Sequence, residues 1–325
     1  MRDEGFKVIA LHFFTGFNGS VSRMIKKGPR WKWIPEQHVI DSALNLGIYL
    51  RPMDVRGEFF NIVCSPRYGY GSSANPCIDC RIFLLKKARE VMEAEGAVLV
   101  FTGEVLGQRP MSQLKNQLRL EEKRSGLDGK LLRPLSAKLL KPTIAEAEGI
   151  VNREHLYDIQ GRSRSRQQEL ARAFGIEVYP SPAGGCVLTD RFFGIKFKDL
   201  ISQSNGNEIT PDDLFSLLTG RHLRLDSGMK VIVGRNESEN NFLMKLLTPR
   251  AWCFEARDYE GASVFALDEP EEGDFLTIAS ITARYGKGAN EDSVAVSAKK
   301  GDNERIFSAK PMKPEDTERL LISRI

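Results

Sequence analysis

CRIFLLKKAREVMEAEGAVLVF, residues 80–101, is the stretch that decides the fold. From Ile82 to Met92 its apolar side chains recur at helical spacing with charged residues between them, which predicts an amphipathic helix over Cys80–Glu95. Gly96 is the residue expected just past a helix end. Ala97–Phe101 is a continuous apolar run, typical of a strand buried in a parallel sheet. A helix followed directly by such a strand indicates an α/β domain.

The segments on either side repeat this alternation. Strands are predicted over Phe6–Phe13 and Ile48–Val55, with a helix over Glu36–Leu46 between them. A second amphipathic helix is predicted over Met111–Arg124. Because strands and helices alternate along the chain, we expect an α/β fold with a doubly wound parallel sheet.

The composition changes after Asp199, where the chain becomes polar and rich in Asn and Gly. We therefore predict two domains, residues 1–205 and residues 206–325. The second is expected to be a smaller α+β domain, with a strand over Met229–Val233 and a helix over Glu237–Leu247.

The overall composition suits a globular protein, since the 325 residues are 41% hydrophobic. It excludes a disordered chain, a collagen and a coiled-coil rod. The longest apolar runs are far shorter than the ~20 residues of a membrane helix, and Asp3 and Glu4 do not suit a signal peptide. We therefore expect a cytoplasmic protein with no membrane partner. The net charge of +4 permits a nucleic-acid partner without requiring one.

Three of the five cysteines indicate a site. Cys77 and Cys80 form a CxxC motif at the start of the predicted helix, where the helix dipole should lower their pKa values. Cys186 ends the loop Pro180–Cys186, and loops that follow the strands of a parallel sheet meet at one edge. The three thiolates therefore form a candidate metal site. A [4Fe–4S] cluster, a zinc ion with an open position, a redox-active pair and a chance pair of buried thiols all remain open.

Residues 101–113, FTGEVLGQRPMSQ, are a candidate ligand-binding segment. Gly103 follows a predicted strand, where the lack of a side chain lets a ligand approach the backbone closely. Arg109, Ser112 and Gln113 add polar groups near the start of the next helix. An ordinary turn between strand and helix is the alternative.

The sequence also contains a basic region. Residues 131–138, LLRPLSAK, are followed by residues 161–166, GRSRSR, in which three arginines alternate with Gly and Ser. Such a run suits contacts with phosphate groups, and a solvated helix face is the alternative. The candidate phosphate contacts are Lys138, Arg162, Arg164 and Arg166.

These segments occur together in a known family. NPCIDCRIFLLKKA, TGEVLGQRPMSQ, LLRPLSAKLL, DIQGRSRSRQ and YPSPAGGCVLTD stand in this order in the chain. Residues 5–200 thereby resemble the PP-loop (N-type ATP pyrophosphatase) tRNA thiolation proteins, in particular the tRNA 4-thiouridine synthetase-like or 2-thiouridylase-like group. The resemblance implies a Rossmann-like fold of the adenine nucleotide alpha hydrolase type.

The resemblance implies an enzyme, a tRNA sulfurtransferase. With ATP and Mg²⁺, such enzymes adenylate the carbonyl oxygen of a tRNA uridine, and sulfur then displaces AMP. In the iron–sulfur-dependent members, three cysteines hold a [4Fe–4S] cluster, and Cys77, Cys80 and Cys186 match them. In the description without a cluster, Cys80 and Cys186 are the catalytic nucleophile and persulfide carrier. The nucleotide-binding residues that the resemblance implies are Thr102, Gly103, Gln108 and Ser112.

One departure from the family concerns the phosphate loop. The family's ATP site begins with a strand that carries an SGGxDS loop, and Phe14–Ser20 keeps only its outline. The strand over Phe6–Phe13 matches the family's second strand, so the family pattern places Met1 inside the domain. Because the backbone amides of such a loop supply most of the phosphate recognition, we expect this chain to bind ATP weakly.

The C-terminal part has a resemblance of its own. Residues 230–240, KVIVGRNESEN, together with the segments around Trp252 and Ala279–Tyr285, resemble an NFACT-R domain, which is associated with RNA or ribosome binding. This implies Arg235 and Asn236 as RNA contacts, and tRNA as the partner of the whole chain. Two other interpretations stay open: a non-catalytic RNA-binding protein that has lost ATP chemistry, and an enzyme that handles sulfide or clusters for a small molecule. The sequence indicates neither the sulfur donor nor the oligomeric state.

Overall fold

The computed structural model describes residues 5–17, 24–27, 30–33, 37–176, 179, 186–204, 209–248 and 250–322, with the backbone alone for 24–27 and 30–33. The chain divides into two compact units, Met1–Thr189 (unit 1) and Asp190–Ile325 (unit 2). This division lies on the N-terminal side of the boundary expected from the sequence, between residues 205 and 206.

Helix α7 (Arg191–Gln203) accounts for the position of the division. Within unit 2, Lys196 Nζ donates a hydrogen bond to the carbonyl oxygen of Leu217. Asp199 forms an ion pair with Arg224, with 2.7 Å between Oδ2 and Nη2. The helix therefore packs with the residues that follow it.

Unit 1 contains two pairs of parallel strands. Strand β1 (Ile9–Phe14) pairs with β4 (Tyr49–Asp54). Strand β5 (Val100–Phe101) pairs with β6 (Leu131–Leu132). Within the ranges that the structure describes, the two pairs share no ladder of hydrogen bonds. The doubly wound sheet therefore stays a prediction.

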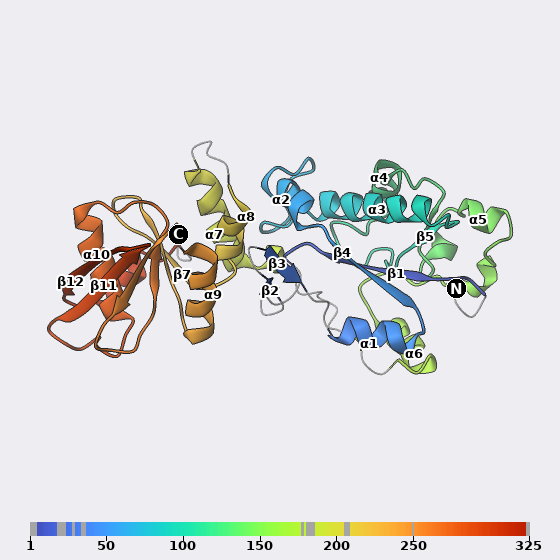
Figure 1. The fold of residues 1–325 in the computed structure, drawn as a ribbon. Helices are drawn as coiled ribbons and strands as arrows, with labels where there is room; N and C mark the ends of the chain where they lie inside the picture. Colours follow the sequence, from blue (N-terminus) through green and yellow to red (C-terminus); the bar gives the residue numbers. More distant parts are fainter. Residues whose placement is uncertain are drawn as a thin grey trace. The chain divides into compact units, whose positions relative to one another are not determined.

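Helices lie on both sides of these strands. Helices α3 and α4 pack against each other on one side, and α1 and α6 lie on the other (Figure 1). No helix in the described parts of the chain is long and apolar enough to cross a membrane. The remaining elements of unit 1 are β2 (Met24–Lys27), β3 (Arg30–Trp33), α1 (Gln37–Asn45), α2 (Arg56–Cys64), α3 (Cys77–Ala94), α4 (Lys115–Ser125), α5 (Ile144–Ala147), α6 (Ser165–Ala173) and the 3-10 helices Ala137–Leu139, Arg153–His155 and Val187–Thr189.

Helix α3 begins at Cys77, three residues before its predicted start. The carboxylate of Asp79 accepts hydrogen bonds from the backbone N–H groups of Arg67 (3.1 Å) and Tyr68 (2.9 Å). The Cys80 N–H donates to the Pro76 carbonyl (2.8 Å), which closes the first turn. Both cysteines of the CxxC motif thus lie in the helix, and the preceding loop is hydrogen-bonded to the same turn.

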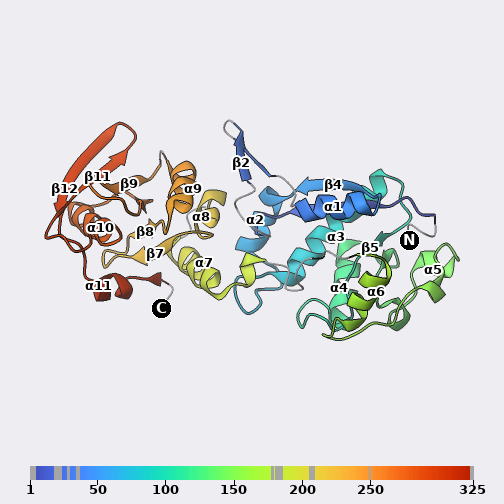
Figure 2. The ribbon, with the colours of Figure 1, turned by 90° about the horizontal axis from the view of Figure 1, so that it is seen from below.

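Unit 2 is built on a six-stranded antiparallel sheet with the order β12–β11–β9–β10–β8–β7. Helix α10 packs on one face, and α8 and α9 pack on the other (Figure 2). Successive residues of β9 follow this division, since Trp252 and Phe254 join the core beside α10, whereas Cys253 joins the core beside α9. The elements are α8 (Pro211–Ser216), β7 (Arg221–Arg224), β8 (Lys230–Val233), α9 (Glu237–Leu247), β9 (Trp252–Ala256), β10 (Val264–Ala266), α10 (Glu272–Arg284), β11 (Val294–Lys300), β12 (Asn303–Ala309) and α11 (Pro314–Arg319).

Candidate functional site

The three candidate cysteines lie in neighbouring segments of unit 1. Cys77 and Cys80 stand in the first turn of α3, and Cys186 directly precedes a 3-10 helix. The Ala74 N–H donates to the Leu188 carbonyl (3.1 Å), which holds the Cys186 segment against the loop before α3. Electrostatic effects connect the three thiols. Cys77 and Cys186 both raise the pKa of Cys80, and Cys77 also raises the pKa of Cys186. Within the described ranges, no group of three or more His, Cys, Asp or Glu side chains is arranged to hold a metal ion, so the metal site stays a prediction.

Burial alters the chemistry expected of these thiols. It raises the pKa of Cys80 to about 12, with Arg81 opposing the rise and the other two cysteines adding to it. Burial also raises the pKa of Cys186, an effect that the Leu188 N–H and the Arg109 guanidinium partly offset. The expected lowering of the pKa is therefore wrong for Cys80, because loss of solvent outweighs the helix dipole.

The segment 101–113 packs against the start of α3. Asn75 Nδ2 donates a hydrogen bond to Cys77 Sγ (3.1 Å) and lies 4.0 Å from Met111 Sδ. Gly71 makes this packing possible, because a Cβ at that position would clash with Asn75 Nδ2 and lie 2.6 Å from Met111 Sδ. Asn75 thereby contacts both the candidate ligand-binding segment and Cys77.

The nucleotide-binding candidates of this segment have different surroundings. Gly103 has open space where a Cβ would stand. Gln108 Nε2 is buried and has no hydrogen-bond partner among the described residues, which suits a ligand that accepts a hydrogen bond. Thr102 Oγ1 already donates to Glu104 (3.0 Å), and Ser112 is buried. Outside the described residues lie the last three residues of the turn that resembles the phosphate loop, Asn18, Gly19 and Ser20.

Backbone contacts place the arginine run beside the same segment. The Gly161 N–H donates to the Leu106 carbonyl (2.7 Å), and Leu106 forms a parallel bridge with Gln160. Gly107 also lies against Gly161, since a Cβ on Gly107 would lie 3.6 Å from the Gly161 nitrogen. The thiols, the segment 101–113 and the arginine run therefore belong to one region of unit 1.

The basic candidates of unit 1 differ in their partners. Arg166 pairs with Asp158 (2.9 Å), and Lys138 pairs with Glu154 (3.3 Å). Exposed pairs of this kind are weak, so a phosphate group can replace the carboxylate. Within the described ranges no ion pair involves the other two candidates, Arg162 and Arg164.

The two candidates of unit 2 also have structural roles. The Asn236 side chain caps α9 by accepting a hydrogen bond from the Glu239 N–H (3.0 Å). Arg235 pairs with Glu239, with 2.5 Å between Nη2 and Oε1. Burial, followed by the charges of Lys230 and Arg235, lowers the pKa of Lys196 to about 8. Arg235 is therefore engaged by a carboxylate and also acts on the charge of Lys196.

A buried network of charges, which the sequence interpretation missed, adjoins the thiols. Glu104 lies between Arg81 (2.6 Å) and Arg133 (3.1 Å). Burial opposes the charge of Glu104, but the two arginines hold its pKa below the usual value. Arg81 directly follows Cys80, so the network and the thiols share one turn of α3. The signal available in the sequence was the presence of opposite charges in two candidate segments: Arg81 beside the CxxC motif and Glu104 in TGEVLGQ.

Glu121 on α4 is a second carboxyl group in this region. It is completely buried, and neither of its oxygens has a hydrogen-bond partner within the described ranges. Burial and then the charge of Glu104 raise its pKa to about 8, against the opposing effect of Arg81 and Arg133. Glu121 also raises the pKa of Cys80. Near neutral pH the Glu121 side chain is therefore mainly protonated.

Glu121→Gln is expected to remove a pH dependence of stability. Because the pKa of Glu121 is raised from 4.5 to about 8 on folding, its contribution to stability falls as the pH rises through that interval. At a slope of about 1.4 kcal/mol per pH unit, the variant gains up to about 2 kcal/mol over the wild type between pH 6 and pH 7.5. Urea denaturation of both proteins at several pH values measures this difference. A difference that does not change with pH contradicts the assignment.

The C-terminal part of the chain is similar to a known RNA-binding module. Residues 220–321 match the NFACT protein RNA binding domain. The match lies within unit 2, from the start of β7 to just past α11, and it confirms the NFACT-R resemblance. It includes Arg235 and Asn236 but does not extend to unit 1, so the resemblance to PP-loop proteins stays a prediction.

The other comparisons add little. None of the curated proteins matches the chain. A solved structure, the C-terminal of the fibronectin/fibrinogen-binding protein from Streptococcus suis, is 14% identical with a TM-score of 0.30. That comparison covers 75% of this chain and 94% of the other. At this identity and TM-score the likeness does not define the fold.

Proposed function

We propose that this protein binds tRNA and transfers sulfur to one of its uridines at the three cysteines of unit 1. The match of residues 220–321 to an RNA-binding domain carries the proposal, because it supports a macromolecular RNA partner. The arginine run adds a second basic surface in the region of the thiols. A substrate as large as tRNA needs phosphate contacts beyond a single pocket.

The thiols support the chemical part of the proposal. Cys77, Cys80 and Cys186 are the residues that would hold a [4Fe–4S] cluster, which supplies an iron with an open position for sulfide. Gly103 has open space for a ligand, and the buried Gln108 Nε2 has no hydrogen-bond partner within the described ranges. These two residues therefore suit ATP and Mg²⁺, which supply an activated uridine with AMP as its leaving group. The positive charge of Arg109 lowers the pKa of Cys186, and such a guanidinium suits the phosphate of that leaving group.

A non-catalytic RNA-binding protein is the second candidate. It is favoured by the extent of the match, which covers the RNA-binding domain alone. The raised pKa values of Cys80 and Cys186 also disfavour chemistry by free thiolates at neutral pH. Both candidates require RNA binding and differ only in whether unit 1 modifies the bound RNA.

Mass analysis of nucleosides in tRNA from a deletion strain separates the two candidates. Loss of one thiolated uridine, with return of the modification when the intact gene is restored, supports sulfur transfer. An unchanged set of thiolated nucleosides, together with tRNA binding by the purified protein, supports the non-catalytic candidate. Absence of both effects contradicts the proposed function.

Replacing Arg162, Arg164 and Arg166 together by Gln is expected to weaken tRNA binding and its salt dependence. Each phosphate contact contributes about 0.7–0.9 to the slope of log K against log salt, so the slope should fall by roughly two units. Filter binding of tRNA at several salt concentrations measures it. The matched control replaces three exposed basic residues of α3 and α4 by Gln, namely Lys86, Lys123 and Arg124. If both triple variants lose the same slope, the run is an ordinary solvated surface.

A further inference from the structure

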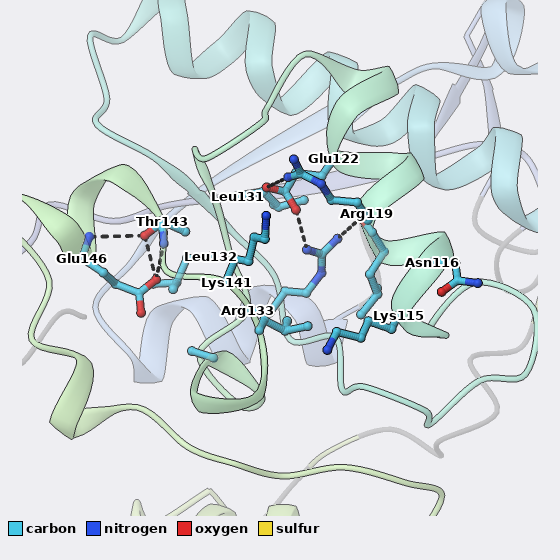
Figure 3. A pocket seen from close by; sticks show the side chains of 13 residues that line it. Lys115, Asn116, Arg119, Glu122, Leu131, Leu132, Arg133, Lys141, Thr143 and Glu146 are labelled. Atoms are coloured by element: carbon cyan, nitrogen blue, oxygen red, sulfur yellow. Dashed lines mark hydrogen bonds and ion pairs between the residues drawn. The ribbon is translucent and has the colours of Figure 1, made fainter.

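Unit 1 contains a pocket that the proposed function does not use. Its volume is about 510 Å³, within the range of about 300–1,000 Å³ that is usual for small-molecule sites. It opens between α4, β6 and the segment 137–146, and Figure 3 shows the residues that line it. Leu140 is the partly exposed residue of its apolar wall, and the buried side chains of Leu118, Leu131 and Leu132 lie behind it. None of the candidate thiol or nucleotide-binding residues is among its lining residues.

The acidic groups of this pocket are already neutralised. Glu122 pairs with Arg119 (3.5 Å) and Arg133 (3.6 Å). Glu146 pairs with Arg153, with 2.5 Å between Oε1 and Nη1, and its other oxygen accepts a hydrogen bond from the Thr143 hydroxyl. The carboxylates are therefore engaged by arginines and by a helix cap.

Two ammonium groups of the pocket remain without such a partner. Lys115 and Lys141 line it, and neither forms an ion pair within the described ranges. Both residues are exposed, so their charges are available to a ligand at the mouth. The pocket thus combines an apolar wall with an excess of two positive charges.

We propose that this pocket binds a nucleoside 5′-monophosphate, either as a free nucleotide or as the 5′ end of an RNA chain. A phosphate monoester carries a charge of about −1.5 to −2 at pH 7, which matches the two free ammonium groups. A phosphodiester within an RNA chain carries only one negative charge and matches them less well. The nucleoside lies against the leucine wall, and the Asn116 amide at the rim adds hydrogen-bonding capacity.

Calorimetric titration of the full chain tests the proposal with four probes. These are AMP, inorganic phosphate, and a short single-stranded RNA with either a 5′-phosphate or a 5′-hydroxyl. The test variant is Lys115→Ala with Lys141→Ala. The matched control is Lys86→Ala with Lys123→Ala, two exposed lysines of α3 and α4 that do not line the pocket. Loss of each charge-assisted hydrogen bond should weaken binding about tenfold or more in the test variant only.

The probes distinguish the two sources of the ligand. AMP binding that the test variant loses indicates a free nucleotide. Tighter binding of the 5′-phosphorylated RNA than of the 5′-hydroxyl RNA, again lost in the test variant, indicates an RNA end. Leu140→Ala should weaken AMP binding several-fold and leave phosphate binding unchanged. The proposal is overturned if inorganic phosphate binds as tightly as AMP, or if neither AMP nor the phosphorylated RNA binds more weakly to the test variant than to the control.

Discussion

Glu104→Ala is expected to destabilise unit 1 by about 3–5 kcal/mol, the cost of removing one partner from a buried ion pair. The change leaves Arg133, whose side chain is only 2% exposed, without its closest carboxylate. It also removes the partner of Arg81 at 2.6 Å. Urea denaturation gives the total change in free energy, and hydrogen exchange of α3 and α4 shows whether the loss is local to unit 1.

Glu95→Ala is the matched control for this prediction. Glu95 also pairs with an arginine, Arg51 at 2.9 Å, but both side chains are more than a third exposed. Its removal should change stability by less than about 1 kcal/mol. Similar losses in the two variants would mean that solvent reaches Glu104 and that the network contributes little.

Local patterns predicted several helices, although not α2 or α7, because the signals for a helix lie within it. Helix α9 occupies Glu237–Leu247 as predicted, since Asn236 caps its first turn and its apolar positions recur at helical spacing. Helix α4 starts later than expected, at Lys115 instead of Met111. The Gln113 N–H donates to the Arg109 carbonyl (3.1 Å), and the Gly107 N–H donates to the Gln113 carbonyl (2.7 Å), so the preceding residues form turns. These turns are closed by hydrogen bonds that the helical periodicity of the sequence does not reveal.

The electrostatics of the candidate site could not be predicted from the sequence. The helix dipole acts within one turn, so the position of the CxxC motif at a predicted helix start is enough to indicate its effect. Burial instead depends on contacts from several segments of the chain. Cys80 is partly buried because α4 packs on α3 and the Cys186 segment lies on the loop before it. Glu121 shows the same limit, since an acidic residue in a charged helix normally indicates a solvent-exposed position.

Anaerobically purified protein is expected to contain iron and sulfide in equal amounts, and Cys80→Ala and Cys186→Ala are each expected to lose nearly all of both. The reason is that the proposed cluster needs all three thiols, and Cys77 influences the pKa of both other cysteines. Three thiolates are the number that leaves one iron of a [4Fe–4S] cluster open. A bound cation also stabilises the thiolate form, which burial alone disfavours. Chemical analysis of iron, sulfide and zinc measures the outcome.

Cys64→Ala is the control for the two cysteine variants. Cys64 ends α2, and burial is the cause of its raised pKa. This variant should therefore keep its iron and sulfide. Stoichiometric zinc without iron in the wild type would replace the cluster by a zinc site with the same ligands. Full retention of iron in Cys186→Ala would instead separate Cys186 from the CxxC pair, and the three cysteines would no longer constitute one site.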